Sequence, residues 1–193
     1  MDTREQFAKT TIALHWIVGL TVIFMVVLGF YMATVRAYPL WPLHKSLGSV
    51  VLVFVLLRSL WRLRSGWPQP VSVYSKFEQR LSRVVHWTLL VATVVMPITG
   101  IISGIAGGYA WVIFGWRLTP DNVNPATANL AGGIHKDHVL PRNAELHDGL
   151  GVVHQTFAYI LAACIVLHIA GALKHHLIDK DGTLRRICGA RIA

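Results

Sequence analysis

Four long apolar segments constrain this chain more than any other feature of its sequence. They run from about residue 11 to 33, 44 to 62, 84 to 106 and 150 to 173. A helix needs roughly twenty apolar residues to cross the hydrocarbon layer of a membrane, and each segment reaches or approaches that length. The sequence therefore predicts an all-α integral membrane four-helix bundle. We expect residues 1–193 to form a single transmembrane domain.

The composition favours a membrane protein and argues against a nucleic-acid-binding one. Of the 193 residues, 54% are hydrophobic and only 14% are charged, whereas soluble domains carry about a quarter charged residues. The formal net charge is +9, but the basic residues interrupt the apolar segments and form no continuous stripe. We interpret them as topology signals, and we expect a lipid bilayer as the partner and no nucleic acid.

Lysine and arginine are distributed unequally between the two sides of a four-span arrangement. Thirteen of the 18 fall on the side that holds both termini and the connection between the second and third segments. The other five fall on the opposite side. Because cytoplasmic loops are enriched in lysine and arginine, both termini should be cytoplasmic. The loop from about Arg117 to Asp148 should then face outward.

Two histidines, His154 and His168, lie fourteen residues apart inside the fourth apolar segment. In an α-helix this spacing corresponds to a rise of about 21 Å and leaves the two side chains about 40° apart around the axis. They therefore lie on nearly the same side, at opposite depths. An ionisable residue inside a membrane is expensive to bury and indicates a functional role. The pair suggests two metal-centred cofactors stacked across the bilayer.

Depth assigns a partner to each of these histidines. The predicted orientation places His15 near the cytoplasmic side and His44 near the outer side. Because the fourth helix runs inward, His154 matches His44 and His168 matches His15. Each pair comes from two different helices, as a planar porphyrin with two axial ligands requires. The sequence thus predicts two haem b per chain with His15, His44, His154 and His168 as axial iron ligands. Small residues near them would allow close approach: Gly29, Gly48, Gly100 and Gly151.

His86 leaves the cytoplasmic side ambiguous, because it lies at the predicted depth of His15 and His168. A six-coordinate haem has only two axial positions, so one of the three must do something else, such as contacting a haem edge or a quinone. Three further histidines lie on the predicted outer loop, where we expect solvated side chains, with a surface zinc site as the alternative: His135, His138 and His147.

Three motifs resemble the bacterial cytochrome b561 family. They are A-L-H-W around His15, P-L-H-K-S-L-G around His44, and L-H-I-A-G-A-L-K-H-H-L-I-D-K-D-G-T-L-R-R from Leu167. The resemblance covers all four segments and implies a di-haem b protein of the bacterial inner (plasma) membrane that takes part in respiratory electron transfer. It implies transfer of single electrons between a donor at the outer face and ubiquinone or a similar quinone. The histidines that match the family's ligands are His15, His44, His154 and His168.

Some members of that family are similar in activity to superoxide oxidases, which implies superoxide as one candidate donor. The sequence of the predicted outer loop does not indicate a strongly cationic funnel for an anion, because its basic residues are balanced by acidic ones. The acidic residues are Asp121, Asp137, Glu145 and Asp148. Lys45 stands next to His44. It is either a local attractor or haem-propionate partner, or a lysine that only extends to the interface.

A quinone needs an apolar slot, donors for its carbonyl oxygens and a route for protons. The candidates at the predicted cytoplasmic end are His175, His86, Lys76 and Arg58. We favour His175 as the quinone ligand, because it follows His168 by one or two helical turns and reaches the interface. The alternative is that His175 only anchors the end of the helix.

Three classes of function fit these features. The first is a stand-alone di-haem electron carrier or quinone-linked oxidoreductase, whose protein partner the sequence does not identify. The second is a membrane-anchor cytochrome b subunit of a larger dehydrogenase or hydrogenase. The third is a metal transporter, which predicts acidic or sulfur co-ligands within the spans. Aspartate and glutamate are absent from the apolar cores, so the sequence disfavours transport.

Overall fold

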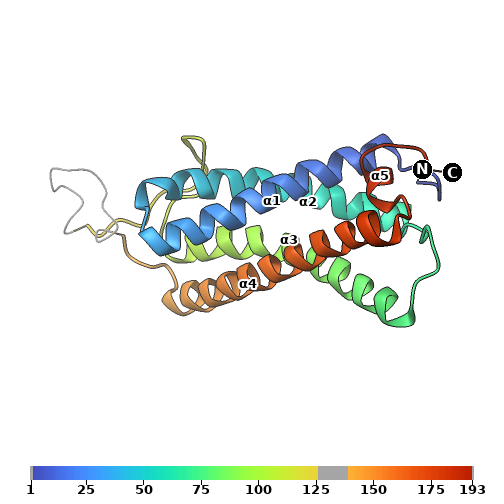
Figure 1. Cartoon of the computed structure of the whole chain (residues 1–193). Coiled ribbons are helices and arrows are strands. Elements are labelled where there is room, and N and C mark those ends of the chain that lie inside the picture. Colours follow the sequence, from blue (N-terminus) through green and yellow to red (C-terminus); the bar gives the residue numbers. More distant parts are fainter. Residues whose placement is uncertain (1, 126–138, 193) are drawn as a thin grey trace. The chain divides into compact units, whose positions relative to one another are not determined.

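A computed structural model describes residues 2–125 and 139–192, and most of this part of the chain is helical (Figure 1). The four long helices are α1 (Lys9–Val35), α2 (Trp41–Ser65), α3 (Lys76–Ala106) and α4 (Ala144–Lys174). A 3₁₀ turn, η1 (Tyr38–Leu40), precedes α2, and a π-helical turn, η3 (His175–Asp179), extends α4. All four helices are long and apolar enough to cross a membrane. The predicted all-α chain with four membrane-spanning helices is confirmed.

Each helix extends beyond the apolar segment that predicted it, most clearly at the starts of α3 and α4. α3 begins at Lys76 rather than near residue 84, because Ser75 and Glu78 form a capping box. The Ser75 N–H donates to Glu78 Oε2 (3.0 Å), and the Glu78 N–H donates to Ser75 Oγ (3.2 Å). α4 begins at Ala144 rather than near residue 150, where Asn143 Oδ1 accepts the N–H of Leu146 (2.9 Å). Polar caps therefore start these helices before their apolar parts.

Contacts along the chain group its residues into two compact units, which we describe separately. Unit 1 contains Met1–Phe24, Val53–Val94 and Tyr159–Ala193. Unit 2 contains Met25–Leu52 and Val95–Ala158. Each of the four long helices contributes one part to unit 1 and the remainder to unit 2.

In unit 1 the two ends of the chain are held together (Figure 1). The short helix α5 (Thr183–Ile187) carries Arg186, which is buried and donates to the backbone carbonyl oxygens of Arg4 (2.8 Å) and Gln69 (3.4 Å). Its guanidinium also lies 4.1 Å from the ring centroid of Phe7. Arg186 therefore joins the N-terminal segment, the connection between α2 and α3, and the C-terminal tail.

In unit 2 the connection after α3 contains a small antiparallel hairpin of β1 (Val112–Ile113) and β2 (Trp116–Arg117). Hydrogen bonds attach this segment to the first turns of α2, and in one of them Ser46 Oγ donates to the carbonyl oxygen of Val112 (3.4 Å). The indole Nε1 of Trp111 donates to Ser49 Oγ (3.0 Å), and the backbone N–H of Phe114 donates to Ser46 Oγ (3.0 Å). Both serines are buried. The hairpin therefore covers the part of α2 that carries His44 and Lys45.

Candidate functional site

His44 on α2 and His154 on α4 face each other in unit 2. Their ring centroids are 6.4 Å apart, and the ring planes meet at 74°. Two imidazoles on opposite sides of one metal, each bonded at about 2 Å, have ring centroids about 6 Å apart. The observed separation therefore fits a pair of axial ligands.

Backbone and side-chain oxygens of α3 hold the ring of His154. Its Nδ1 lies 2.9 Å from the carbonyl oxygen of Met96 and 3.2 Å from Thr99 Oγ1. Because a carbonyl oxygen only accepts, Nδ1 carries the proton in this contact and Nε2 keeps its lone pair. Metal-binding histidines commonly donate their second ring N–H in this way. The facing ring of His44 has no such acceptor, since its Nδ1 is buried without a hydrogen-bond partner in the described part of the chain.

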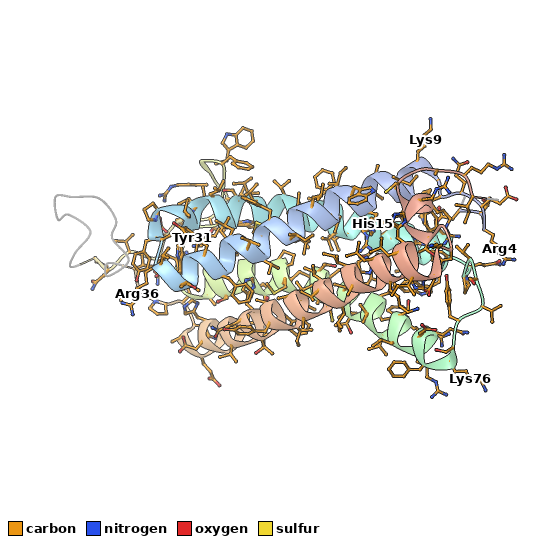
Figure 2. All side chains as sticks on the ribbon, viewed as in Figure 1. Arg4, Lys9, His15, Tyr31, Arg36 and Lys76 are labelled. Atoms are coloured by element: carbon orange, nitrogen blue, oxygen red, sulfur yellow. The ribbon has the colours of Figure 1, made fainter. Side chains whose placement is uncertain are left out.

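His15 on α1 and His168 on α4 come together in unit 1, where Figure 2 labels His15. Their ring centroids are 6.0 Å apart, which again fits two ligands of one metal. His86 on α3 packs edge-on against His168 with a centroid separation of only 5.0 Å. Its Nδ1 lies 2.6 Å from the carbonyl oxygen of Ser82 in its own helix. The separations and the Ser82 contact therefore favour His15 over His86 as the partner of His168, a choice that depth alone could not make.

Each of the four paired histidines has a glycine three or four residues away on its own helix, so that both lie on one helical face. These glycines are Gly19, Gly48, Gly151 and Gly171. A Cβ atom added at Gly19, Gly151 or Gly171 would meet no atom within 4 Å, the helix's own backbone aside. At Gly48 it would meet only the methyl carbon of Met25, at 3.7 Å. A flat macrocycle beside each imidazole would use this open space. Gly48 and Gly151 were among the small residues expected near the ligands, whereas Gly19 and Gly171 were not, although their spacing from His15 and His168 is the same kind of signal.

Two glycines of neighbouring helices let the backbone approach the rings in unit 2. A Cβ at Gly100 would lie 3.1 Å from Cε1 of His154, and one at Gly29 would lie 3.5 Å from Cε1 of His44. Gly100 therefore has almost no room for a larger side chain while His154 keeps its position. These are two of the four glycines that the sequence singled out.

The sequence predicted that His147 lies in a solvated loop, and this prediction is wrong. His147 lies in the first turns of α4, half-buried, with Nδ1 2.8 Å from the carbonyl oxygen of Ser103. This contact repeats that of His154 with Met96 at positions seven residues away on both helices. The prediction failed because the cap at Asn143 starts α4 earlier than its apolar part. His135 and His138, the other members of the suggested zinc site, lie outside the described residues.

His175, the predicted quinone ligand, lies in a polar cluster at the end of α4. Its Nδ1 is 3.0 Å from Asp179 Oδ2 and 2.9 Å from Asp181 Oδ2, and its ring centroid is 4.8 Å from that of Tyr74. The ligand atoms of His175, Asp179 and Asp181 all lie within 4.8 Å of one another. The ammonium of Lys174 already pairs with Asp179 at 2.8 Å, which disfavours a bound cation.

The other predicted quinone candidates lie in different surroundings. Arg58 is half-buried on α2 within unit 1. Lys76 is exposed at the start of α3, where its side chain points away from the helices (Figure 2). His175 therefore combines a half-buried position with two acidic neighbours, whereas Lys76 is exposed.

Lys45 is enclosed by aromatic rings beside His44. Its ammonium lies 4.5 Å from the ring centroid of Tyr109 and 5.9 Å from that of Trp41, within the range of cation–π attraction. Burial opposes ionisation of the nearby Asp121. Hydrogen bonds from the Ala110 N–H (2.8 Å) and from Arg117 (2.7 Å) outweigh burial and hold the pKa of Asp121 below its usual value. A fixed cation and a fixed anion therefore lie in this part of unit 2.

Membrane-length helices that carry two facing histidine pairs are typical of membrane cytochromes. A family model described as "Prokaryotic cytochrome b561" matches residues 6–190. The chain therefore belongs to the prokaryotic cytochrome b561 family, and it is a multi-pass membrane protein that binds haem b and acts in electron transfer. The resemblance found in the sequence motifs is confirmed.

Individual relatives support the same assignment over nearly their whole length. "Cytochrome b561 homolog 2" of Escherichia coli (strain K12) is 31% identical over 97% of this chain and 94% of the relative. "Probable superoxide oxidase CybB" of Yersinia pestis is 29% identical over 95% of this chain and 96% of the relative. "Cytochrome b561 homolog 1" of Escherichia coli (strain K12) is 27% identical over 97% and 99%, respectively.

The open space beside the histidines predicts that Gly151→Leu lowers haem content. A leucine at this position would occupy the space one turn from His154, whereas helix propensity favours leucine over glycine and should not destabilise α4. Gly149→Leu is a matched control, because Gly149 is also exposed on α4 with no atom within 4 Å of an added Cβ. It lies five residues from His154, on a different face. Haem per chain should fall only in Gly151→Leu, and equal content in both variants would contradict the prediction.

Proposed function

We propose that this protein is a di-haem b electron carrier that passes single electrons from a donor at the outer face of the bacterial inner membrane to the quinone pool. His44 and His154 would hold one haem iron, and His15 and His168 the other. The observation that carries the proposal is the spacing of the two pairs, 6.4 and 6.0 Å between ring centroids. We take the whole chain as one functional domain.

The residues around the paired histidines suit bound haem b, which would supply an iron that gains or loses one electron. The Met96 carbonyl oxygen orients His154 and leaves Nε2 free for iron. Nδ1 of His44 is a buried atom that still lacks a partner, as expected for a ring whose surroundings are completed by a further group. The apolar helices exclude water, and a low local polarity raises the electrostatic influence of nearby charges.

We propose that both termini are cytoplasmic, together with His15, His168 and His175. The excess of lysine and arginine at these ends supports this orientation. Both chain ends also lie together in unit 1, where the N–H of Ile192 donates to the carbonyl oxygen of Glu5 (3.0 Å). His175 at the end of α4 would then bind a ubiquinone-type quinone at the cytoplasmic interface.

Superoxide is our candidate for the outer-face donor, and Lys45 is the observation that favours it. Lys45 lies next to His44, with its charge held between Tyr109 and Trp41 rather than extended freely into water. A fixed cation beside a redox centre attracts a small anion. One relative carries the name "Probable superoxide oxidase CybB". In the proposed reaction superoxide would lose one electron to the haem and leave as dioxygen.

The pairing predicts which substitutions act on the same haem. The double variant His44→Ala with His154→Ala should lose one haem and retain one low-spin haem b. His15→Ala with His168→Ala should retain the other, with a different α-band. Difference spectra of the reduced and oxidised proteins, with haem counted per folded chain, measure both outcomes. His147→Ala is the control, because this histidine contacts Ser103 rather than a second imidazole, and it should keep two haems. Loss of all haem in one folded double variant would show that the pairing is wrong.

Lys45 predicts a charge-dependent rate of haem reduction by superoxide. Lys45→Met should slow this step by about tenfold, because it removes the cation that attracts the anion. Reduction by an uncharged reductant should not change. Arg36→Met removes an exposed cation of unit 2 and should have little effect. Equal superoxide rates in the wild type and Lys45→Met, measured by stopped flow at low ionic strength, would exclude Lys45 from this role.

A further inference from the structure

We propose that Asp181 is the residue that positions His175 for quinone reduction. Its carboxylate would hold the Nδ1 side of the imidazole, so that Nε2 faces the quinone. This inference rests on the quinone site proposed above and adds the group that orients its ligand. Asp181 lies six residues beyond His175, past the left-handed turn at Lys180 (φ 51°), and both residues belong to the Tyr159–Ala193 part of unit 1.

The surroundings of Asp181 keep it as a fixed anion. Its side chain is only 4% exposed. The hydroxyl of Tyr74 donates to Oδ2, and the backbone N–H of Thr183 donates to Oδ1 (2.8 Å). Burial opposes ionisation of Asp181, but the hydrogen bonds from Tyr74 and Thr183 outweigh it and place its pKa below the usual value. Burial and the bond to Asp181 raise the pKa of the Tyr74 hydroxyl, so Tyr74 keeps its proton.

The position of the His175 imidazole is consistent with a hydrogen bond to the Asp181 carboxylate. Nδ1 lies 2.9 Å from Asp181 Oδ2 and is shielded from solvent, without an aligned hydrogen bond. Because the distance is already that of a hydrogen bond, a small rotation of the ring would direct its N–H to the carboxylate. With Nδ1 on this side, Nε2 is the nitrogen left for another partner. A metal-free imidazole oriented by a buried carboxylate is the arrangement that also serves proton transfer in catalytic triads.

Asp179 is the competing carboxylate, and its other contacts make it the weaker partner. Both of its oxygens already accept from Lys174 Nζ, at 2.9 and 2.8 Å. Its side chain is 24% exposed, six times the exposed fraction of Asp181. A neutralised and more exposed carboxylate attracts an N–H less strongly than a buried one. Lys174 also pairs with Glu78 (2.8 Å).

The proposed step balances as a two-electron, two-proton reduction. The quinone would take two electrons, delivered singly from the haem that His15 and His168 would hold, and each of its two carbonyl oxygens would take one proton. His175 would give the proton of Nε2 to the nearer oxygen and take one back from cytoplasmic water, the farther oxygen would take its proton from cytoplasmic water directly, and the Nδ1–H of His175 would stay with Asp181. The carboxylate of Asp181 would keep the ring in the orientation that presents Nε2 to the quinone. Because Asp181 does not touch the quinone, it is a positioning residue.

The test measures reoxidation of the reduced, haem-loaded protein by decylubiquinone in stopped flow. Asp181→Asn should slow reoxidation by about tenfold or more, and Asp181→Glu should recover part of the rate. Haem content and reduction from the outer face should stay unchanged, which a general loss of structure would not allow. Glu78→Gln is the matched control, because it removes a carboxylate of the same cluster that contacts Lys174 rather than His175. It should remain within about twofold of the wild type.

A double variant separates positioning from an independent effect. If Asp181 acts through His175, adding Asp181→Asn to His175→Ala should slow reoxidation no further. Additive effects, or an unchanged rate in Asp181→Asn while His175→Ala is slow, would overturn the positioning role. An unchanged rate in His175→Ala would instead overturn the proposed quinone site. If Asp181→Asn loses haem, Tyr74→Phe takes its place and should slow reoxidation about threefold when His175 is present. A wild-type rate in Tyr74→Phe would then reject the proposal.

Discussion

Burying imidazole nitrogens among apolar helices is the constraint on which the rest of this structure depends. A polar group without a partner is costly in such surroundings. Each buried histidine therefore needs a hydrogen-bond acceptor for its ring N–H and a partner for its second ring nitrogen. α3 supplies acceptors to α4 twice, through the carbonyl oxygens of Met96 and Ser103. His44 has no such acceptor, and its Nδ1 remains unpartnered in the described part of the chain. The family assignment identifies haem b as the cofactor, and binding of its iron would offset the free-energy cost of burying the imidazole nitrogens.

Small residues near the histidines are the second condition for placing the rings and a cofactor between the helices. The glycines one turn from each paired histidine leave room beside the rings, whereas Gly100 lets α3 approach His154 closely. Along α4 and the turn η3 that extends it, positions 147, 154, 161, 168 and 175 are spaced by seven residues, and four of them are histidine. The fifth, Leu161, is only 1% exposed. One heptad pattern therefore carries a tethering histidine, two candidate haem ligands and the candidate quinone ligand.

The helices and histidine pairs could be predicted because both follow from fixed helical geometry. Hydropathy located the four spans, and the fourteen-residue spacing of His154 and His168 gave their depths. Depth could not choose between His15 and His86, since that choice needs the distance across the unit. Helix starts were placed too late where polar caps, such as Ser75 with Glu78, extend them. Asp181 was missed because its contact with Tyr74 joins residues that are far apart in the sequence.

The central claim is that each histidine pair binds one haem iron through both rings. Its most direct test is the haem b content per chain of the purified wild-type protein, together with the electron paramagnetic resonance spectrum of the oxidised form. Two imidazole ligands give six-coordinate, low-spin ferric iron. Two bis-histidine sites should give two haems per chain and two low-spin signals without a high-spin component. One haem per chain, or a high-spin signal that accounts for one of two haems, would contradict it.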